Sequence, residues 1–378
     1  MKTVLVLAPN VKPYPGGAEI YISNLIEHLP AEEWRVICVT ENVPEIKRKN
    51  ISYIPLIADI ERIRSNKTVT WREMYFSLFD QLVELENEKI DIIHANSMEA
   101  CIIGKILSIQ MKAPLVATIH EHMPELKSFG RGRVGLIFDN LAPDAIIAPS
   151  SYYFNRTAAY GYDESRIYKV MHGIDAEEFT GFRSKIDLRK KYALNILFVG
   201  RVYETKGLYY LVKALVNCDI PVNYHLNVVG PITDASYKEK IDDLVCEYGI
   251  SDKISFTGAV SPDMVKEYMS ASDLMIAPSL DEGFGLAIVE AIFMHIPVIA
   301  AKVGGIVDII TDRKEGLLFE PKDVSGLIRC IQTFISDPAM IKKYEKNAFI
   351  KASALFRIER MAKETAGVYR KVIKKWEN

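Results

Sequence analysis

The feature that most restricts the fold of this chain is a repeated alternation of short apolar runs with amphipathic segments. In the first half the runs are apolar throughout, which is typical of parallel strands covered by helices on both faces. They read TVLVLAP, RVICVT, DIIHAN, PLVATIH and DAIIAPS. Between the first two, AEIYISNLIEHL spaces its apolar residues as a helix does, which predicts a helix over 18–29.

The same alternation begins again at residue 195. Its runs are NILFVG, YHLNVVG, KISFTG, DLMIAPS, PVIAA and GLLFE. The charged stretch TGFRSKIDLRKKYA interrupts the pattern, and 378 residues exceed one ordinary core. We therefore predict an α/β protein with two doubly wound Rossmann-like domains, 1–182 and 183–355, and a ligand crevice at the carboxyl ends of their strands. A terminal helix over 356–378 is expected to pack back on the first domain.

Composition excludes several classes of protein. The net charge of −2 gives no general attraction to nucleic acid. The five cysteines are far apart and form no Cys-x-x-Cys pair, which favours a reducing cytoplasm over a disulfide framework or a zinc site. The first apolar run is too short for a signal peptide, and no run reaches the roughly 18–20 residues of a membrane span. We expect at most a peripheral contact with the inner membrane surface.

A glycine pair, Gly16 and Gly17, stands between the first predicted strand and the first predicted helix. Exposed amides and the helix dipole favour an anion at such a point. A tight turn with no ligand is the alternative, because glycine turns are common.

Two cations follow the first strand of the second half, in FVGRVYETKGL. Arg201 and Lys206 lie within one loop between a strand and a helix, where they are suited to a diphosphate. The alternative is a solvated charged loop.

The stretch SLDEGFGLAIVEA places two acids around Gly283, Phe284 and Gly285. We predict that a helix starts near Leu286 with these three amides exposed at its N-terminus. Glu282 precedes the helix and Glu290 lies more than a turn inside it, so the two acids would bind different hydroxyls of one extended ligand. Alternatively, Glu282 is a capping acid and Glu290 a surface residue.

These segments together resemble the retaining glycosyltransferases of family four, which have the GT-B fold. The resemblance rests on PYPGGAE, FVGR followed by KG, PSLDEGFGLAIVEA, PVIAAKVGG and GLLFEP. It covers nearly the whole chain and is strongest over 196–320. It implies a nucleotide-sugar donor bound mainly by the C-terminal domain and an acceptor bound mainly by the N-terminal one.

The resemblance also implies residue roles. Gly16 and Gly17 would face the donor phosphates, and Arg201 and Lys206 would hold the diphosphate. Glu282, assisted by the amides of 283–286, would meet the transferred sugar, and Glu290 the ribose. His120 matches a histidine near the transferred sugar, and its neighbours Glu121 and His122 could face the acceptor. No Asp-x-Asp occurs, so we expect Arg201 and Lys206 to act where other enzymes use a metal ion.

The chain departs from the family pattern at three positions. Asn96 stands where a second histidine is frequent, and His172 where asparagine is common. His295 stands where a glycine often ends the helix, which puts that helix end in doubt.

We expect a hexosyltransferase of the glucose or N-acetylglucosamine type that uses a uridine diphosphate sugar and needs no metal or organic cofactor. The alternatives are a GDP-mannose-dependent mannosyltransferase, a nucleotide-sugar epimerase and a sensor that binds the donor without turnover. The acceptor would be a glycan, a lipid-linked sugar or a small metabolite.

Two segments bear on the acceptor. Apolar residues at helical spacing in TWREMYFSLFDQLVELE and the bases of KSFGRGRVGLIF could approach a membrane surface, although core packing and a loop explain them more simply. They are Trp71, Met74, Tyr75, Leu78, Phe79 and Leu82, and Lys127, Arg131 and Arg133.

Overall fold

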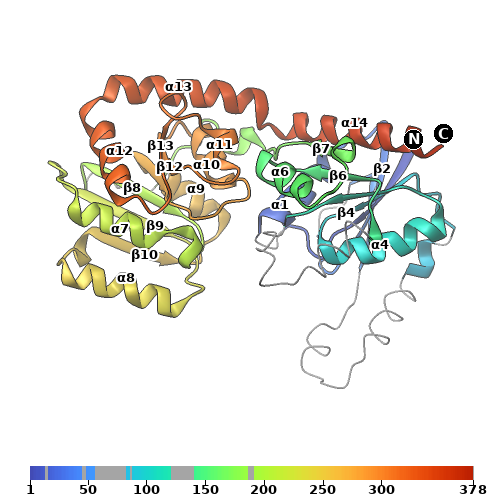
Figure 1. Ribbon diagram of the computed structural model, residues 1–378, viewed down its shortest axis with the longest axis horizontal. Helices are drawn as coiled ribbons and strands as arrows, with labels where there is room; N and C mark the ends of the chain where they lie inside the picture. The colour runs from blue at the N-terminus through green and yellow to red at the C-terminus, as the bar shows by residue number, and fades with distance from the viewer. Residues whose placement is uncertain are drawn as a thin grey trace, which may run out of the picture. The chain divides into compact units, whose positions relative to one another are not determined.

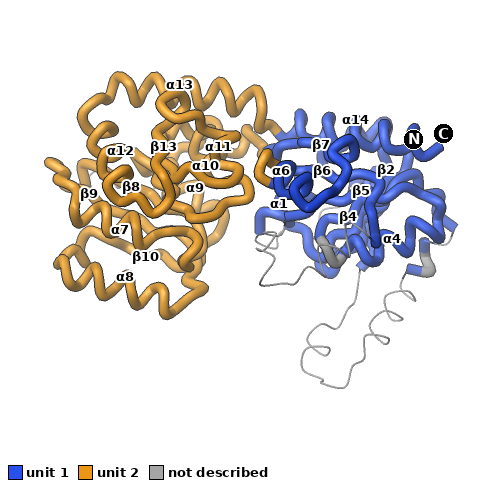
Figure 2. The backbone as a smooth tube through the Cα atoms, in the orientation of Figure 1, with its two compact units in different colours: residues 1–149, 153–173, 358–378 blue, residues 150–152, 174–357 orange. Residues whose placement is uncertain are grey.

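The computed structural model describes residues 1–12, 16–44, 48–55, 82–85, 87–120, 140–185 and 191–377. They form two compact units, coloured separately in Figure 2. Unit 1 comprises 1–149, 153–173 and 358–378, and unit 2 comprises 150–152 and 174–357. The long segment of unit 2 begins at Ile174, whereas the sequence places the domain boundary at 182/183. The backbone N–H of Ile174 donates to the carbonyl of Phe356, also in unit 2, at 2.9 Å.

Unit 1 is built on a seven-stranded sheet with the order β3-β2-β1-β4-β5-β6-β7, and every adjacent pair is parallel. Its strands are β1 (Lys2–Leu7), β2 (Trp34–Thr40), β3 (Ile51–Pro55), β4 (Ile92–Ala95), β5 (Leu115–Thr118), β6 (Ala145–Ala148) and β7 (Ile167–Lys169).

Unit 2 is built on a six-stranded parallel sheet with the order β10-β9-β8-β11-β12-β13. Its strands are β8 (Leu194–Val199), β9 (Tyr224–Val229), β10 (Ile254–Gly258), β11 (Leu274–Ala277), β12 (Val298–Ala301) and β13 (Leu317–Phe319). Each apolar run of the sequence contributes a strand, so the predicted pair of doubly wound α/β sheets is confirmed.

Helices connect the strands, as Figure 1 shows. They are α1 (Gly17–His28), α4 (Met98–Met111), α6 (Ser151–Ala159), α7 (Leu208–Asn217), α8 (Ala235–Glu247), α9 (Pro262–Ser270), α10 (Leu286–Phe293), α11 (Ile306–Ile309), α12 (Val324–Ser336), α13 (Pro338–Leu355) and α14 (Ile358–Glu377). Side-chain caps fix several of their starts. The Ser97 hydroxyl accepts from the amide of Ala100 at α4, and the Asp234 carboxylate accepts from the amide of Tyr237 at α8.

The C-terminal helix α14 belongs to the core of unit 1. Its buried residues include Met361, Tyr369 and Ile373, which share a core with Ile22 and Leu25 of α1. Contacts join α14 to α1 directly. Burial of one face of a 20-residue helix stabilises the unit far more than its helix propensity does.

Strands β3 and β7 do not stand out as apolar runs in the sequence. Both lie at the edges of the first sheet, and the only buried residues are Ile51 in β3 and Ile167 in β7. An edge strand has one neighbour and partial cover, so it does not need a continuous apolar sequence.

Helix α10 keeps the usual helix ending although a histidine replaces glycine. His295 adopts φ of +60° and donates its backbone N–H to the Ile292 carbonyl at 3.0 Å, while Ile296 donates to Ala291 at 2.9 Å. These are the two hydrogen bonds of a Schellman motif. The His295 ring stacks on Phe349 with the centroids 4.3 Å apart, which offsets part of the strain of a left-handed residue. The sequence left the end of this helix in doubt because of His295, and the structure shows the usual ending.

Both segments that bear on the acceptor lie mainly outside the described residues. Residues 56–81 and 121–139 contain Trp71, Lys127 and the candidate residues Glu121 and His122. Leu82 is described, and it is buried at the start of a short 3-10 helix, Leu82–Leu85. In the described part of the chain, no helix is long and apolar enough to cross a membrane.

Candidate active site

The candidate residues follow the strands at which each sheet reverses its strand order. In unit 1, β1 and β4 are adjacent at this switch point, and Gly16 and Asn96 lie in the segments after them. In unit 2, β8 and β11 are adjacent, and Arg201 and Glu282 lie after them. Ligands of open α/β sheets bind at such points, outside the carboxyl ends of the strands.

In unit 2 the two switch-point loops are fastened to each other through the backbone. Leu280 donates its N–H to the Thr205 carbonyl at 2.7 Å. Gly207 has φ of +69°, and a Cβ there would lie 1.9 Å from the carbonyl oxygen of Pro278. Only glycine permits this approach, and therefore the KG of the sequence fixes the distance between the loops.

Lys206 and Glu282 meet across these loops. The Lys206 ammonium lies 2.6 Å from Oε2 of Glu282, and the two side chains are 20% and 19% exposed. The structure therefore brings together two of the predicted residues, a cation and an acid, as a direct and partly buried pair. Such a pair is screened less by solvent than a surface ion pair.

Arg201 is exposed, and its guanidinium lies over the ring of Tyr203 at 4.9 Å from the centroid. This stacking limits the positions of a long side chain without neutralising its charge. Arg201 therefore adds an accessible positive charge to the loop that carries Lys206.

Helix α10 starts at Leu286, as predicted. Gly283, Phe284 and Gly285 are buried as whole residues. The Phe284 side chain is 4% exposed and packs edge-on against Phe356, so its ring belongs to the core. Glu290 is partly exposed in the second turn of the helix.

A second glycine pair explains this burial, and sequence reasoning gave it no role. A Cβ at Gly304 would lie 1.7 Å from the carbonyl oxygen of Glu282, and Gly304 has φ of +50°. Gly305 donates its N–H to the same carbonyl at 2.9 Å. The segment AKVGG thus supports the loop of Glu282, and the signal in the sequence is a glycine pair two residues after a strand.

Residues 150–152 of unit 2 also hold this region. The Ser150 hydroxyl donates to the Gly283 carbonyl at 2.7 Å. Asp308 accepts hydrogen bonds from the backbone N–H and the hydroxyl of Ser151, at 2.6 and 2.7 Å. No motif in the sequence marks these contacts, because they join residues far apart in the chain.

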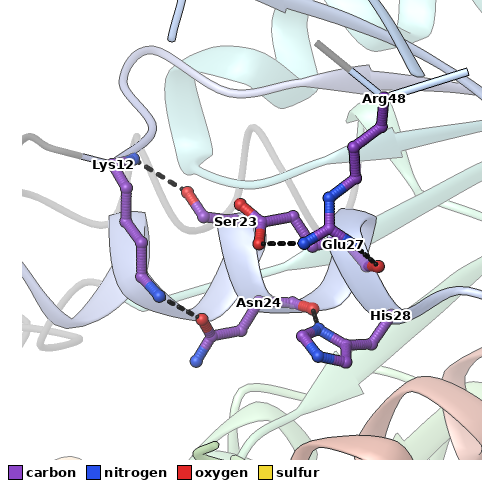
Figure 3. A network of polar contacts seen from close by, with 6 residues as sticks. All are labelled: Lys12, Ser23, Asn24, Glu27, His28 and Arg48. Carbon is purple, nitrogen blue, oxygen red and sulfur yellow. Dashed lines mark hydrogen bonds and ion pairs between the residues drawn. The ribbon is translucent and has the colours of Figure 1, made fainter. Parts of the chain in front are cut away.

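In unit 1 Lys12, which precedes α1 in the chain, is held by polar residues of that helix (Figure 3). Lys12 donates its backbone N–H to the Ser23 hydroxyl at 2.8 Å and its ammonium to Oδ1 of Asn24 at 2.6 Å. Ser23 and Asn24 are buried. Gly16 is the residue before the helix, and Gly17 is exposed as its first residue.

His120 lies after β5 within a cluster of rings. The ring of Tyr21 lies 4.8 Å and that of His172 lies 5.5 Å from the His120 ring, between centroids. Its Nε2 is 3.0 Å from Oδ1 of Asn96. Desolvation lowers the pKa of His120 to about 3, so the imidazole is neutral at pH 7.

A second histidine, His94 of β4, is fully buried and was not predicted as a site residue. Its Nδ1 lies 2.5 Å from the Tyr369 hydroxyl and its Nε2 lies 2.8 Å from that of Thr118. Burial lowers the pKa of His94 to about 3. The sequence DIIHAN does not mark His94 as a site residue, because the pattern of an apolar strand does not indicate which side chains its histidine contacts.

Two further observations concern chemistry. Among the residues that the structure describes, no group of three or more histidine, cysteine, aspartate or glutamate side chains could hold a metal ion. All five cysteines lie in the described part of the chain, and none of them forms a disulfide.

Comparisons with known proteins identify the family of this chain. The family model described as "Glycosyltransferase Family 4" matches residues 15–178, and that described as "Glycosyl transferases group 1" matches 181–351. An uncharacterized glycosyltransferase of Methanocaldococcus jannaschii, MJ1607, is 26% identical over 380 residues, 94% of each chain. The lipopolysaccharide core biosynthesis mannosyltransferase LpsB of Rhizobium meliloti is 28% identical over 61% of this chain and 66% of its own.

The solved structures include Anabaena Alr3699/HepE in complex with UDP and glucose. It superposes with a TM-score of 0.80 at 22% identity and covers 98% of this chain and 100% of that one. The same protein has been solved with UDP-glucose. At this identity the likeness shows the fold, which is GT-B. With family models over both halves and this fold, the chain belongs to the glycosyltransferases of group 1 and family 4, and it is a glycosyl-transferring enzyme.

Proposed function

We propose that the enzyme moves a hexosyl unit of the glucose or N-acetylglucosamine type from a uridine diphosphate sugar to an acceptor hydroxyl, with retention of configuration. The observation that carries this proposal is the pair of Lys206 and Glu282, 2.6 Å apart on the two loops after β8 and β11. A diphosphate needs cations and a sugar needs hydrogen-bond acceptors, and this pair supplies one of each at one point.

Lys206 can serve the diphosphate without leaving Glu282. An ammonium carries three N–H donors, so one can stay on the carboxylate while the others bind phosphate oxygens. Arg201 adds the second positive charge. The second oxygen of Glu282 accepts from a hydroxyl of the transferred sugar, and Glu290 accepts from the ribose hydroxyls.

The reaction forms a bond between the acceptor oxygen and the anomeric carbon and breaks the bond from that carbon to the diphosphate. The acceptor attacks on the face that the diphosphate leaves, and its hydroxyl proton passes to the departing phosphate oxygen. Negative charge grows on the diphosphate through an oxocarbenium-like state. Arg201 and Lys206 bind that charge more strongly as it grows, which is what lowers the barrier.

Unit 1 supplies the remaining contacts in this proposal. Gly16 and Gly17 face the donor phosphates, and His120 meets the transferred sugar. Glu121 and His122 are kept as acceptor residues, although they lie outside the described residues. The acceptor is a glycan, a lipid-linked sugar or a small metabolite. The names of relatives such as LpsB support a glycan.

One alternative has its own support. LpsB is named as a mannosyltransferase, which favours a guanosine diphosphate mannose donor. The UDP and UDP-glucose complexes of HepE support the uridine donor. The charges around Lys206 suit either diphosphate.

The test is a thermal-shift panel of nucleotide sugars, without metal, on the wild type, Glu290→Ala and the control Glu247→Ala. Glu247 is an exposed glutamate of α8 in the same unit. We expect stabilisation by a UDP-hexose that is weakened only in Glu290→Ala. Transfer to a sugar acceptor with that donor, followed by assignment of the anomeric configuration, then tests retention. Selective stabilisation by GDP-mannose would replace the donor, and no stabilisation by any nucleotide sugar would refute the proposal.

A further inference from the structure

Asn96 joins two parts of the unit 1 site through the two ends of its amide. It follows β4, is 3% exposed, and occupies the position where the family frequently has a histidine. Its Nδ2 donates to the Ala18 carbonyl at 3.2 Å. Its Oδ1 lies 3.0 Å from Nε2 of His120. One side chain thus connects the first turn of α1 with the histidine after β5.

The contact with Ala18 fixes which way the amide points. A backbone carbonyl only accepts hydrogen bonds, so the NH₂ group of Asn96 must face it. The reversed amide would place Oδ1 against the Ala18 oxygen and would bring two acceptors together in a buried position. Such a contact leaves Oδ1 of Asn96 without a donor and sets it against a second oxygen, at a cost of about 1–3 kcal/mol.

The orientation of the amide in turn decides where the proton of His120 lies. Oδ1 can only accept, so Nε2 must be the ring nitrogen that carries hydrogen. The imidazole is neutral at pH 7, as described above, and a neutral ring carries a single proton. Its Nδ1 is therefore the acceptor nitrogen.

We propose that Asn96 is a positioning residue that holds His120 as the Nε2–H tautomer. The tautomer itself follows from contacts within unit 1. The role of this tautomer in the reaction rests on the proposed function. In that role, Nδ1 of His120 accepts a hydrogen bond from a sugar hydroxyl and does not donate one. Asn96 also fixes the position of His120 relative to Gly16 and Gly17, because its other contact, Ala18, is the second residue of α1.

The direct test is nitrogen-15 NMR of the full chain with labelled histidine, at about pH 7, where a ring of such low pKa is neutral. The pattern of couplings from the ring protons distinguishes Nε2–H from Nδ1–H. His120→Gln identifies the signals of His120 among those of the seven histidines. We expect Nε2–H in the wild type, and Nδ1–H in the wild type would overturn the proposal.

Two variants separate the ends of the amide. Asn96→Asp keeps an acceptor for Nε2 and gives up the donor to Ala18, so Nε2 of His120 should stay protonated. Asn96→Leu removes both, and the tautomer ratio should move toward Nδ1–H by about tenfold, since one ordinary hydrogen bond sets a ratio of that order. The control Asn227→Leu removes another buried amide, in β9 of unit 2, and should leave His120 unchanged.

An unchanged His120 pattern in Asn96→Leu would overturn the proposal even if that variant were less stable. Turnover is measured separately. Wild type that shows Nε2–H but transfers no sugar would refute the proposed function and leave the role of Asn96 intact. Loss of turnover in Asn96→Leu, with activity regained in Asn96→Asp, would support both.

Discussion

The two units have the same parallel architecture but differ in the chemistry at their switch points. In unit 1 the rings near the switch point are neutral and buried, with His94 and Tyr21 at 0% and 1% exposure, and the ammonium of Lys12 is bonded to buried Asn24. In unit 2 they are charged and partly exposed, as in the pair Lys206 and Glu282. The difference teaches that one architecture can carry a partly exposed ion pair in one unit and a buried cluster of neutral rings in the other, because the chemistry depends on the side chains near each switch point and not on the fold.

The largest expected effect tests the charge in unit 2. Lys206→Ala should lower turnover on the order of 10²–10³, the usual loss when one donor to a developing negative charge is removed. The control is Lys213→Ala, an exposed lysine of the adjacent helix α7, which should change turnover little. Turnover of Lys206→Ala within a few fold of the wild type would show that the cation does not act in the reaction.

The next effect tests whether the backbone of unit 2 holds the acid in place. Gly304→Ala combines a left-handed residue with a contact of 1.7 Å to the Glu282 carbonyl and should cost about 3 kcal/mol or more. Gly249→Ala has φ of +63° but meets nothing within 4 Å, so it should cost only about 1–2 kcal/mol.

Calorimetry measures the two costs, and tryptophan fluorescence shows which unit is affected. All three tryptophans, Trp34, Trp71 and Trp376, lie in residue ranges of unit 1. The fluorescence transition should therefore change little in Gly304→Ala. Equal costs for the two alanine variants would mean that the second glycine pair does not support the Glu282 loop.

A smaller effect tests the neutral histidines of unit 1. His94 has a pKa near 3 in the folded chain and an ordinary value near 6.5 when unfolded. Between these values the unfolded chain binds more protons, so stability falls as the pH falls below 6.5. The loss from His94 should reach about 1.4 kcal/mol at about pH 5.5.

Urea unfolding followed by tryptophan fluorescence measures this loss in unit 1. The variant His94→Gln should show less dependence on pH than the wild type between neutral pH and pH 5.5. An identical dependence in the two proteins would contradict the assignment of a neutral buried imidazole.

The smallest effect on donor binding is expected at Lys12, the lysine that follows β1 in unit 1. Lys12→Met removes a hydrogen bond from a charged donor to buried Asn24 and should destabilise unit 1 by about 1.5–3 kcal/mol. Its donor KM should change little, because Lys12 anchors the turn before α1. A KM increase as large as that of Lys206→Met would show that both lysines bind the donor.

Much of the fold was predictable, because parallel strands need continuous apolar runs and the chain supplies them in two series. The start of α10 follows from the glycines before it. The sequence also marked Lys206 and Glu282 as site residues, but it did not predict that they contact each other. The edge strands β3 and β7 were not predicted, because a partly buried strand does not need an apolar sequence. The contact of His94 with Tyr369 was not predicted for another reason. The two residues are 275 positions apart, and no local pattern in the sequence records such a contact.

The most direct test of the central claim compares the affinities of UDP and UMP for the wild type and Lys206→Met by calorimetric titration. If unit 2 recognises the second phosphate by charge, UDP should bind the wild type at least about tenfold more tightly, since a charge-assisted hydrogen bond contributes about 1.5–3 kcal/mol. The ratio should fall toward one in Lys206→Met. An unchanged preference for UDP in that variant would contradict the account.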